Sequence, residues 1–142
     1  MTERQANFSG SAIFDLLQIA GNFPDSAETM LIDTRMTDES AASARVFRIY
    51  TPVPEHYHAT CDEYLLVLSG KGTMVIDGLG SVALDAGKMA FFKRGTIHAI
   101  PEIVEAPFVF LAVDTPRRDP KDVIFVTPDG TVREFMETRQ LY

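Results

Sequence analysis

The chain has 142 residues, which suits one ordinary domain with a single hydrophobic core. Hydrophobic residues make up 46% and charged residues 23%, the balance of a soluble globular protein and not of a disordered one. A net charge of −7 gives no electrostatic footprint for nucleic acid or for an anionic membrane, so neither is an expected partner. The single cysteine, Cys61, excludes an internal disulfide and is typical of a cytosolic protein.

No part of the sequence contains the roughly 20 consecutive apolar residues that would span a bilayer. The first residues, Met1-Thr2-Glu3-Arg4, also lack the charged lead and apolar run of a secretory signal. We therefore expect a cytoplasmic protein.

A short amphipathic helix is predicted over residues 9–20, and Gly21 is the expected stop. Its apolar residues recur at positions i, i+3, i+4 and i+7, namely Ile13, Leu16, Leu17 and Ala20. The expected organisation is a single domain. In it a helix and first strand, residues 1–40, pack on a β-barrel of residues 41–142.

Short strands separated by turn residues follow from about Thr29 onward, and many short strands at even spacing predict an all-β sandwich or barrel. The turn residues include Pro52, Pro54 and the segment Ser69-Gly70-Lys71-Gly72. The expected strands are Thr29–Thr34, Ala44–Thr51, Glu63–Leu68, Thr73–Asp77, Ser81–Leu84, Met89–Lys93, His98–Ile100, Phe108–Asp114 and Val123–Val126.

Two of these strands are apolar on both faces, over residues 64–68 and 109–113. A strand that is buried on one side only should alternate between apolar and polar residues. One face is therefore expected to line the barrel. The other face should meet a second sheet, the N-terminal helix or a partner subunit.

The three histidines of the chain, together with one carboxylate, form a candidate metal site. His56 and His58 stand two residues apart, so in a strand both side chains point to the same face. Glu63 opens the next apolar strand, and His98 begins another strand after a turn. Imidazole with carboxylate is a ligand set for Fe, Mn, Ni, Zn or Cu. An octahedral ion held by these four residues would keep two positions open.

Two segments of the chain resemble the two sequence motifs of the cupin family. His56-Tyr57-His58, four residues, Glu63, six residues and Gly70 match the first motif. Gly87, five residues, Lys93-Arg94-Gly95, two residues and His98 resemble the second motif. The spacer between the motifs, residues 71–86, is close to the shortest in the family and is typical of its microbial members.

The resemblance implies a fold and a ligand set. The fold would be a cupin double-stranded β-helix, or jelly-roll, barrel with a short N-terminal helix. The ligands of one divalent metal ion would be His56, His58, Glu63 and His98. Three turn positions depart from the family pattern, and none of them is a ligand in the family: Tyr50, Lys93 and Glu102 stand where glycine, proline and asparagine are expected.

The fold by itself hosts many unrelated functions. The complete ligand set favours a metal-dependent enzyme that acts on a small organic molecule, with a dioxygenase or an isomerase foremost and a lyase behind. A non-enzymatic protein that binds or senses a small ligand stays open, as does a storage protein with a structural metal. A transcription factor is not expected, since only one helix is predicted before the barrel and the chain has no basic patch.

Three residues are candidates for a catalytic or substrate-binding role. Tyr64 would act as a general base, although it should point away from the ligands, where packing or an interface explains it more simply. Arg48 shares strand parity with the histidines, unless the intervening prolines break it, and would bind a substrate carboxylate or phosphate. Arg94 lies in the turn before His98 and is a further candidate of the same kind.

Four further expectations concern the surroundings of the site. Cys61 is expected as a small buried apolar residue and not as a ligand. The charged segment 115–122 is expected to be a solvated loop, with a lid over the barrel as the alternative. The expected apolar lining of the interior comprises Leu65, Val67 and Phe110. Outward-facing apolar residues predict a homodimer, namely Tyr64, Leu66 and Leu68.

Overall fold

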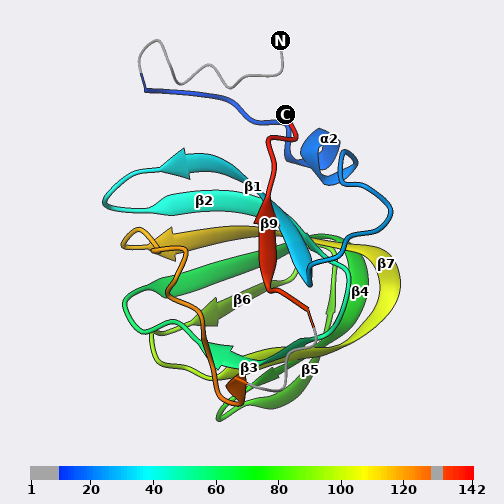
Figure 1. The fold of residues 1–142 in the computed structure, drawn as a ribbon, viewed down its shortest axis with the longest axis vertical. Helices are drawn as coiled ribbons and strands as arrows, with labels where there is room; N and C mark the ends of the chain where they lie inside the picture. The colour runs from blue at the N-terminus through cyan, green and yellow to red at the C-terminus, as the bar shows by residue number, and fades with distance from the viewer. Residues whose placement is uncertain (1–9, 129–132) are drawn as a thin grey trace.

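The computed structural model describes residues 10–128 and 133–142, which form one nine-stranded sheet and one short helix, α2 (Leu16–Ala20). The all-β class predicted from the sequence is confirmed. Figure 1 shows the strands curving into two layers that enclose the core. The strands are β1 (Leu31–Asp38), β2 (Ser43–Ile49), β3 (Val53–Tyr57), β4 (Asp62–Ile76), β5 (Gly80–Asp85), β6 (Met89–Phe92), β7 (His98–Thr115), β8 (Ile124–Phe125) and β9 (Met136–Thr138).

The strands are paired in the order β5-β4-β7-β2-β1-β9. β3 joins this path by pairing with β7 and β8, and β6 joins it by pairing with β4. The long strands β4 and β7 run antiparallel to each other with several register shifts. Such irregularities bend a strand, which allows β4 and β7 to take part in both layers (Figure 1). The two ends of the path, β5 and β9, do not pair with each other within the described part of the chain.

Two expected turns lie inside continuous strands. The predicted strands 63–68 and 73–77 are both parts of β4, and the predicted strands 98–100 and 108–114 are both parts of β7. Gly70 bends β4 without ending it, since its φ of +84° is a conformation that glycine adopts at no steric cost. A Cβ at this position would lie 2.3 Å from the Pro107 carbonyl oxygen, so β7 approaches β4 here more closely than a side chain permits.

Two strands were not predicted. β3 was missed because the prolines at 52 and 54, just before and within it, argue against a strand, although a short strand with irregular pairing tolerates proline. β3 pairs with β7 at only two positions, Val53 with Ile100 and His56 with His98, with a register shift between them. β9 has three residues and pairs in parallel with β1, a contact between distant segments that local patterns do not indicate.

The helix is shorter than the predicted range 9–20, of which Ser9 lies outside the described residues. Asp15 begins the helix because its backbone is extended and its carboxylate accepts the Gln18 N–H. Ile13 therefore precedes the helix and is exposed, and the end of the helix before Gly21 is confirmed. None of the described helical segments is long and apolar enough to cross a membrane.

Two hydrophobic clusters explain why some strands are apolar on both faces. One fills the space between the two layers of the sheet and includes Phe47, Leu65 and Phe110. The other lies between the outer face of the sheet and α2 and includes Val46 and Val109, so successive residues of β7 enter different clusters. The other face of these strands is thus covered in part by the N-terminal helix.

The first 40 residues are tied to the rest of the sheet. β1 pairs with β2 along its whole length, so residue 40 falls between two paired strands. The C-terminal residues run back to α2 (Figure 1), where Asn22 donates to the Leu141 carbonyl and the rings of Phe14 and Tyr142 meet at 5.7 Å.

Candidate metal centre

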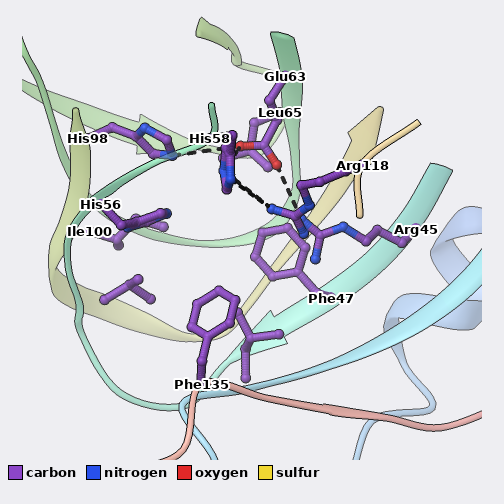
Figure 2. Close-up of a pocket in the computed structure, with 12 residues that line it drawn as sticks. Arg45, Phe47, His56, His58, Glu63, Leu65, His98, Ile100, Arg118 and Phe135 are labelled. Carbon is purple, nitrogen blue, oxygen red and sulfur yellow. Dashed lines mark hydrogen bonds and ion pairs between the residues drawn. The ribbon is translucent and has the colours of Figure 1, made fainter. Parts of the chain in front are cut away.

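The three histidines come together because β3 pairs with β7. His56 and His98 are directly opposite each other in the ladder, so their side chains share the inner face. His58 follows β3 by one residue, and its ring lies 5.4 Å from the ring of His56. One ring nitrogen from each histidine lies within 4.8 Å of those of the other two, and all three residues are buried. Figure 2 shows the three rings facing a common point.

The outward-facing nitrogen of each ring is held by a backbone carbonyl. The Nδ1 atoms of His56, His58 and His98 lie 2.7, 2.7 and 2.9 Å from carbonyl oxygens. These oxygens belong to Pro54, Asp122 and Thr96 respectively. A carbonyl only accepts hydrogen bonds, so Nδ1 carries the proton and donates it. Each ring thereby turns its Nε2 inward, as in a metal-ligating histidine.

Burial keeps His56 and His98 uncharged. It is the main reason that the pKa of His56 falls to about 3, with repulsion from the neighbouring His98 adding to it. Burial likewise lowers the pKa of His98. The ring of His98 is held in place by Phe92, which stacks on it with 3.9 Å between ring centroids. Neutral imidazoles are the form that binds a metal ion.

Glu63 supplies the only carboxylate that lines the pocket within the described residues. Its Oε1 lies 3.3 Å from His58 Nε2 and 3.7 Å from His98 Nε2. Burial raises the pKa of Glu63, but the hydrogen bond with His58 and two nearby guanidinium groups outweigh it and hold the pKa well below its usual range. The adjacent acid, Asp62, points outward and binds Arg94, as strand alternation requires.

Two buried arginines flank this group, and sequence reasoning missed them as pocket residues. Arg45 on β2 lies 3.3 Å from Glu63 and is also within 4 Å of Asp33 and Asp114. Arg118 follows β7, and its Nη1 lies 3.3 Å from both ring nitrogens of His58 (Figure 2). Both guanidinium groups reach the same oxygen of Asp114, at 3.6 and 3.8 Å.

The arginine expected at the site was the wrong one. Arg48 points to the outer face of β2, donates to the Pro24 carbonyl and lies over the ring of Tyr50. Inward positions of β2 are 45, 47 and 49, so the parity argument failed at the bend that the prolines introduce. Arg45 on the same strand does reach the pocket. The strand parity of β2, counted from the buried Phe47, would have singled it out.

The other candidates also lie outside the pocket. Tyr64 is 41% exposed on the outer face, where its ring packs against Phe91 at 4.8 Å. Arg94 is exposed and paired with Asp62. Cys61 is buried, as expected, and lies beside Asp122 and not among the ligand atoms. Of the predicted apolar lining, Leu65 borders the pocket, whereas Val67 and Phe110 belong to the core beyond it.

The charged segment 115–122 folds against the site and is not a fully solvated loop. Arg117 points outward to Asp38, but Arg118 is only 2% exposed. Asp122 joins the segment to the histidine loop: its carboxylate accepts the Ala59 N–H, the Thr60 N–H and the Thr60 hydroxyl. Its carbonyl oxygen is the acceptor that orients His58. The segment therefore positions a candidate ligand.

The pocket between these groups has a volume of about 30 Å³, room for about two water-sized groups. One end holds the histidines, Glu63 and the two arginines, and the other end is apolar. The apolar lining residues are Leu31, Phe47, Val53, Leu65, Ile100 and Phe135. Three imidazoles and one carboxylate around such a space are a donor set that fits a divalent metal ion.

The comparisons with known proteins agree with this geometry. The sequence profile of the cupin domain, Cupin_2, matches residues 49–114, which contain all four candidate ligands. An uncharacterized protein from Aquifex aeolicus (strain VF5) is 30% identical over 119 residues, covering 84% of this chain and 96% of the relative. The chain belongs to the cupin family. The resemblance seen in the two motifs is thereby confirmed.

Solved structures share the fold of this cupin. An uncharacterized conserved protein with a double-stranded β-helix domain, from Klebsiella pneumoniae, superposes with a TM-score of 0.62. The two proteins are 21% identical, and the match covers 75% of this chain and 91% of that one. The DMSP lyase DddQ from Ruegeria pomeroyi has a TM-score of 0.56 at 23% identity, covering 66% of this chain and 47% of that one. The predicted double-stranded β-helix is confirmed.

Proposed function

We propose that this cupin holds one divalent metal ion through His56, His58, Glu63 and His98 and acts on a small organic molecule. The observation that carries the proposal is the common orientation of the three histidines. Each Nδ1 is held by a backbone carbonyl, so three Nε2 atoms face one buried point beside the Glu63 carboxylate. Aligning three imidazoles in this way costs conformational freedom, and a metal ion makes use of all three lone pairs at once.

A metal-dependent enzyme is the function that this arrangement supports best. When bound, the ion would serve as a Lewis acid or would bind a substrate or dioxygen. The protein's own groups would hold the ligand set rigid, exclude water with the apolar half of the pocket and set the charge around the bound molecule. A dioxygenase or an isomerase is the leading class, with a lyase behind, and Fe, Mn, Ni, Zn and Cu are all compatible with the donor set.

The metal is tested first by elemental analysis of the protein purified without affinity-tag histidines. We expect about one equivalent of metal in the wild type and a loss of most of it in His98→Ala and Glu63→Gln. The matched control is Asp62→Asn, which removes the neighbouring outward-facing acid and should retain the full equivalent. Failure of the wild type to bind any metal, even after reloading, would overturn the proposal.

A non-enzymatic binding or sensing protein is the alternative function. The pocket of about 30 Å³ limits the occupant to a few atoms under either function, so the volume does not separate the two. Oxygen consumption and substrate depletion, measured with the metal-loaded protein and panels of small acids, thiols and sugars, separate the two. Turnover that disappears in Glu63→Gln supports the enzyme. Ligand-dependent thermal stabilisation without turnover supports the binding protein.

A further inference from the structure

Arg118 is the group in this pocket whose bonding is least complete. It is 2% exposed, and its Nη2 has no hydrogen-bond partner among the described residues. Its contact with a carboxylate is long, 3.8 Å from Nε to Asp114. A buried donor without a partner costs stability, and the cost is larger for a charged group. Such a group calls for an explanation.

The neighbouring Arg45 also has one buried nitrogen without a hydrogen-bond partner, Nε, but it differs from Arg118 in its ion pairs. Its guanidinium group lies within 4 Å of three buried carboxylates, those of Asp33, Glu63 and Asp114. Arg45 therefore serves as the buried counter-ion of this acidic group. Arg118 adds a second positive charge beside it, at the edge of the pocket and against the ring of His58.

The charges around the pocket favour an anionic occupant. When all are ionised, two guanidinium groups and the three carboxylates that Arg45 contacts carry one net negative charge, which a divalent ion would convert into one net positive charge. Burial raises the pKa of Asp114, and its protonation would make the metal-loaded pocket more positive, which favours an anion further. The nearby Asp122 does not line the pocket, and its carboxylate is bound by backbone amides and a hydroxyl. A molecule with a single negative charge would neutralise the metal-loaded pocket.

We propose that Arg118 binds the carboxylate group of the small molecule that this cupin takes up next to its metal ion. The inference rests on the proposed function, and it defines the substrate class as small monocarboxylates with a short apolar body. The free Nη2 of Arg118 supplies the donor, and residues such as Phe47 and Phe135 enclose the apolar part. A carboxylate suits the site better than a larger, doubly charged oxyanion, because only one nitrogen of the Arg118 guanidinium group is without a protein contact.

The test uses cobalt-loaded protein, with Co²⁺ as the metal probe and acetate as the anion probe. Acetamide is the neutral analogue of the same shape. Co²⁺ content is measured by elemental analysis, and binding is followed by the visible absorption of the cobalt and by calorimetry. We expect acetate to bind wild type about tenfold or more tightly than acetamide, and Arg118→Gln to lose about tenfold in acetate affinity.

The matched control is Arg117→Gln, which removes the same charge from the adjacent, outward-facing arginine and should leave acetate binding unchanged. Arg118→Lys keeps the charge in case the glutamine variant does not fold, and it should bind acetate with intermediate affinity. Circular dichroism checks the fold of each variant.

Equal affinity for acetate and acetamide in the wild type overturns the inference. So does wild-type acetate affinity in folded Arg118→Gln or Arg118→Lys. If Co²⁺ loads normally in these cases, the proposed metal centre stands and only the role of Arg118 falls. A wild type that takes up no Co²⁺ overturns both.

Discussion

Replacing Asp122 with alanine should weaken metal binding although it removes no candidate ligand. The carboxylate accepts three hydrogen bonds from the loop that carries His58, at 2.7, 2.9 and 2.6 Å. The carbonyl of the same residue fixes the His58 tautomer. The variant keeps this carbonyl but releases the loop, so the acceptor and the ring of His58 are no longer held firmly against each other.

The magnitude follows from these contacts. A hydrogen bond to a charged group contributes about 1.5–3 kcal/mol, but water replaces part of this at a carboxylate near the surface. We expect the free energy of unfolding to fall by about 2–3 kcal/mol in total. Loss of a group that orients a metal-ligating histidine typically lowers metal affinity by about 10- to 100-fold.

Two assays measure these effects. Denaturant unfolding in the presence of a chelator gives the stability, and calorimetry with Zn²⁺ gives the affinity. Asp119→Ala is the control, since this acid lies in the same segment and accepts only an exposed N–H from Lys121 among the described contacts. Asp122→Asn retains an acceptor oxygen and should recover part of the affinity. If Asp122→Ala binds Zn²⁺ within about twofold of wild type, the backbone alone orients His58 and the reasoning is refuted.

Three further predictions concern stability and assembly. Gly70→Ala should lower the free energy of unfolding by more than about 2 kcal/mol, because the new Cβ would lie 2.3 Å from the Pro107 carbonyl oxygen and the residue would also have a strained positive φ. The control is Gly78→Ala, which has the same strain (φ +86°) but open space around the Cβ, and it should cost about 1 kcal/mol. Equal losses in the two variants would contradict the close approach of β4 and β7. The metal-free protein should lose stability as pH falls from about 6.5 towards about 3, since the pKa of His56 is about 3 in the folded state and protons therefore bind the unfolded state more readily. His56→Gln cannot take up this proton, so its free energy of unfolding, measured in chelator at several pH values, should fall less on acidification than that of the wild type. An equal fall in the two proteins would rule out His56 as the cause. The homodimer stays a prediction. Met89 and Phe91 adjoin Tyr64 as exposed apolar residues on the outer face of the sheet. Light scattering should report a dimer that Phe91→Asp weakens, and a monomeric wild type would exclude the dimer.

The sequence by itself determined the fold class and the candidate ligands. The histidine spacing and the position of Glu63 are local features, and strand alternation is enough to turn two side chains to one face. That argument also placed Tyr64 and Asp62 outside correctly. The two motifs identified the family because they combine ligand residues with the glycines that bend the strands between them.

Only the tertiary structure decided what surrounds those ligands. The ladder between β3 and β7 brings His98 opposite His56 across more than forty residues of sequence, and the return of segment 115–122 brings Arg118 onto His58. No local pattern distinguishes Arg118 from the exposed Arg117 beside it, and the strand parity that separates Arg45 from Arg48 could be counted correctly only once the inward face of β2 was known. Which of two nearby arginines is buried depends on the direction in which a loop or a strand bend turns the backbone. That direction is set by pairing between distant segments, because packing and charge compensation become defined only when the two layers of the sheet have come together around the pocket.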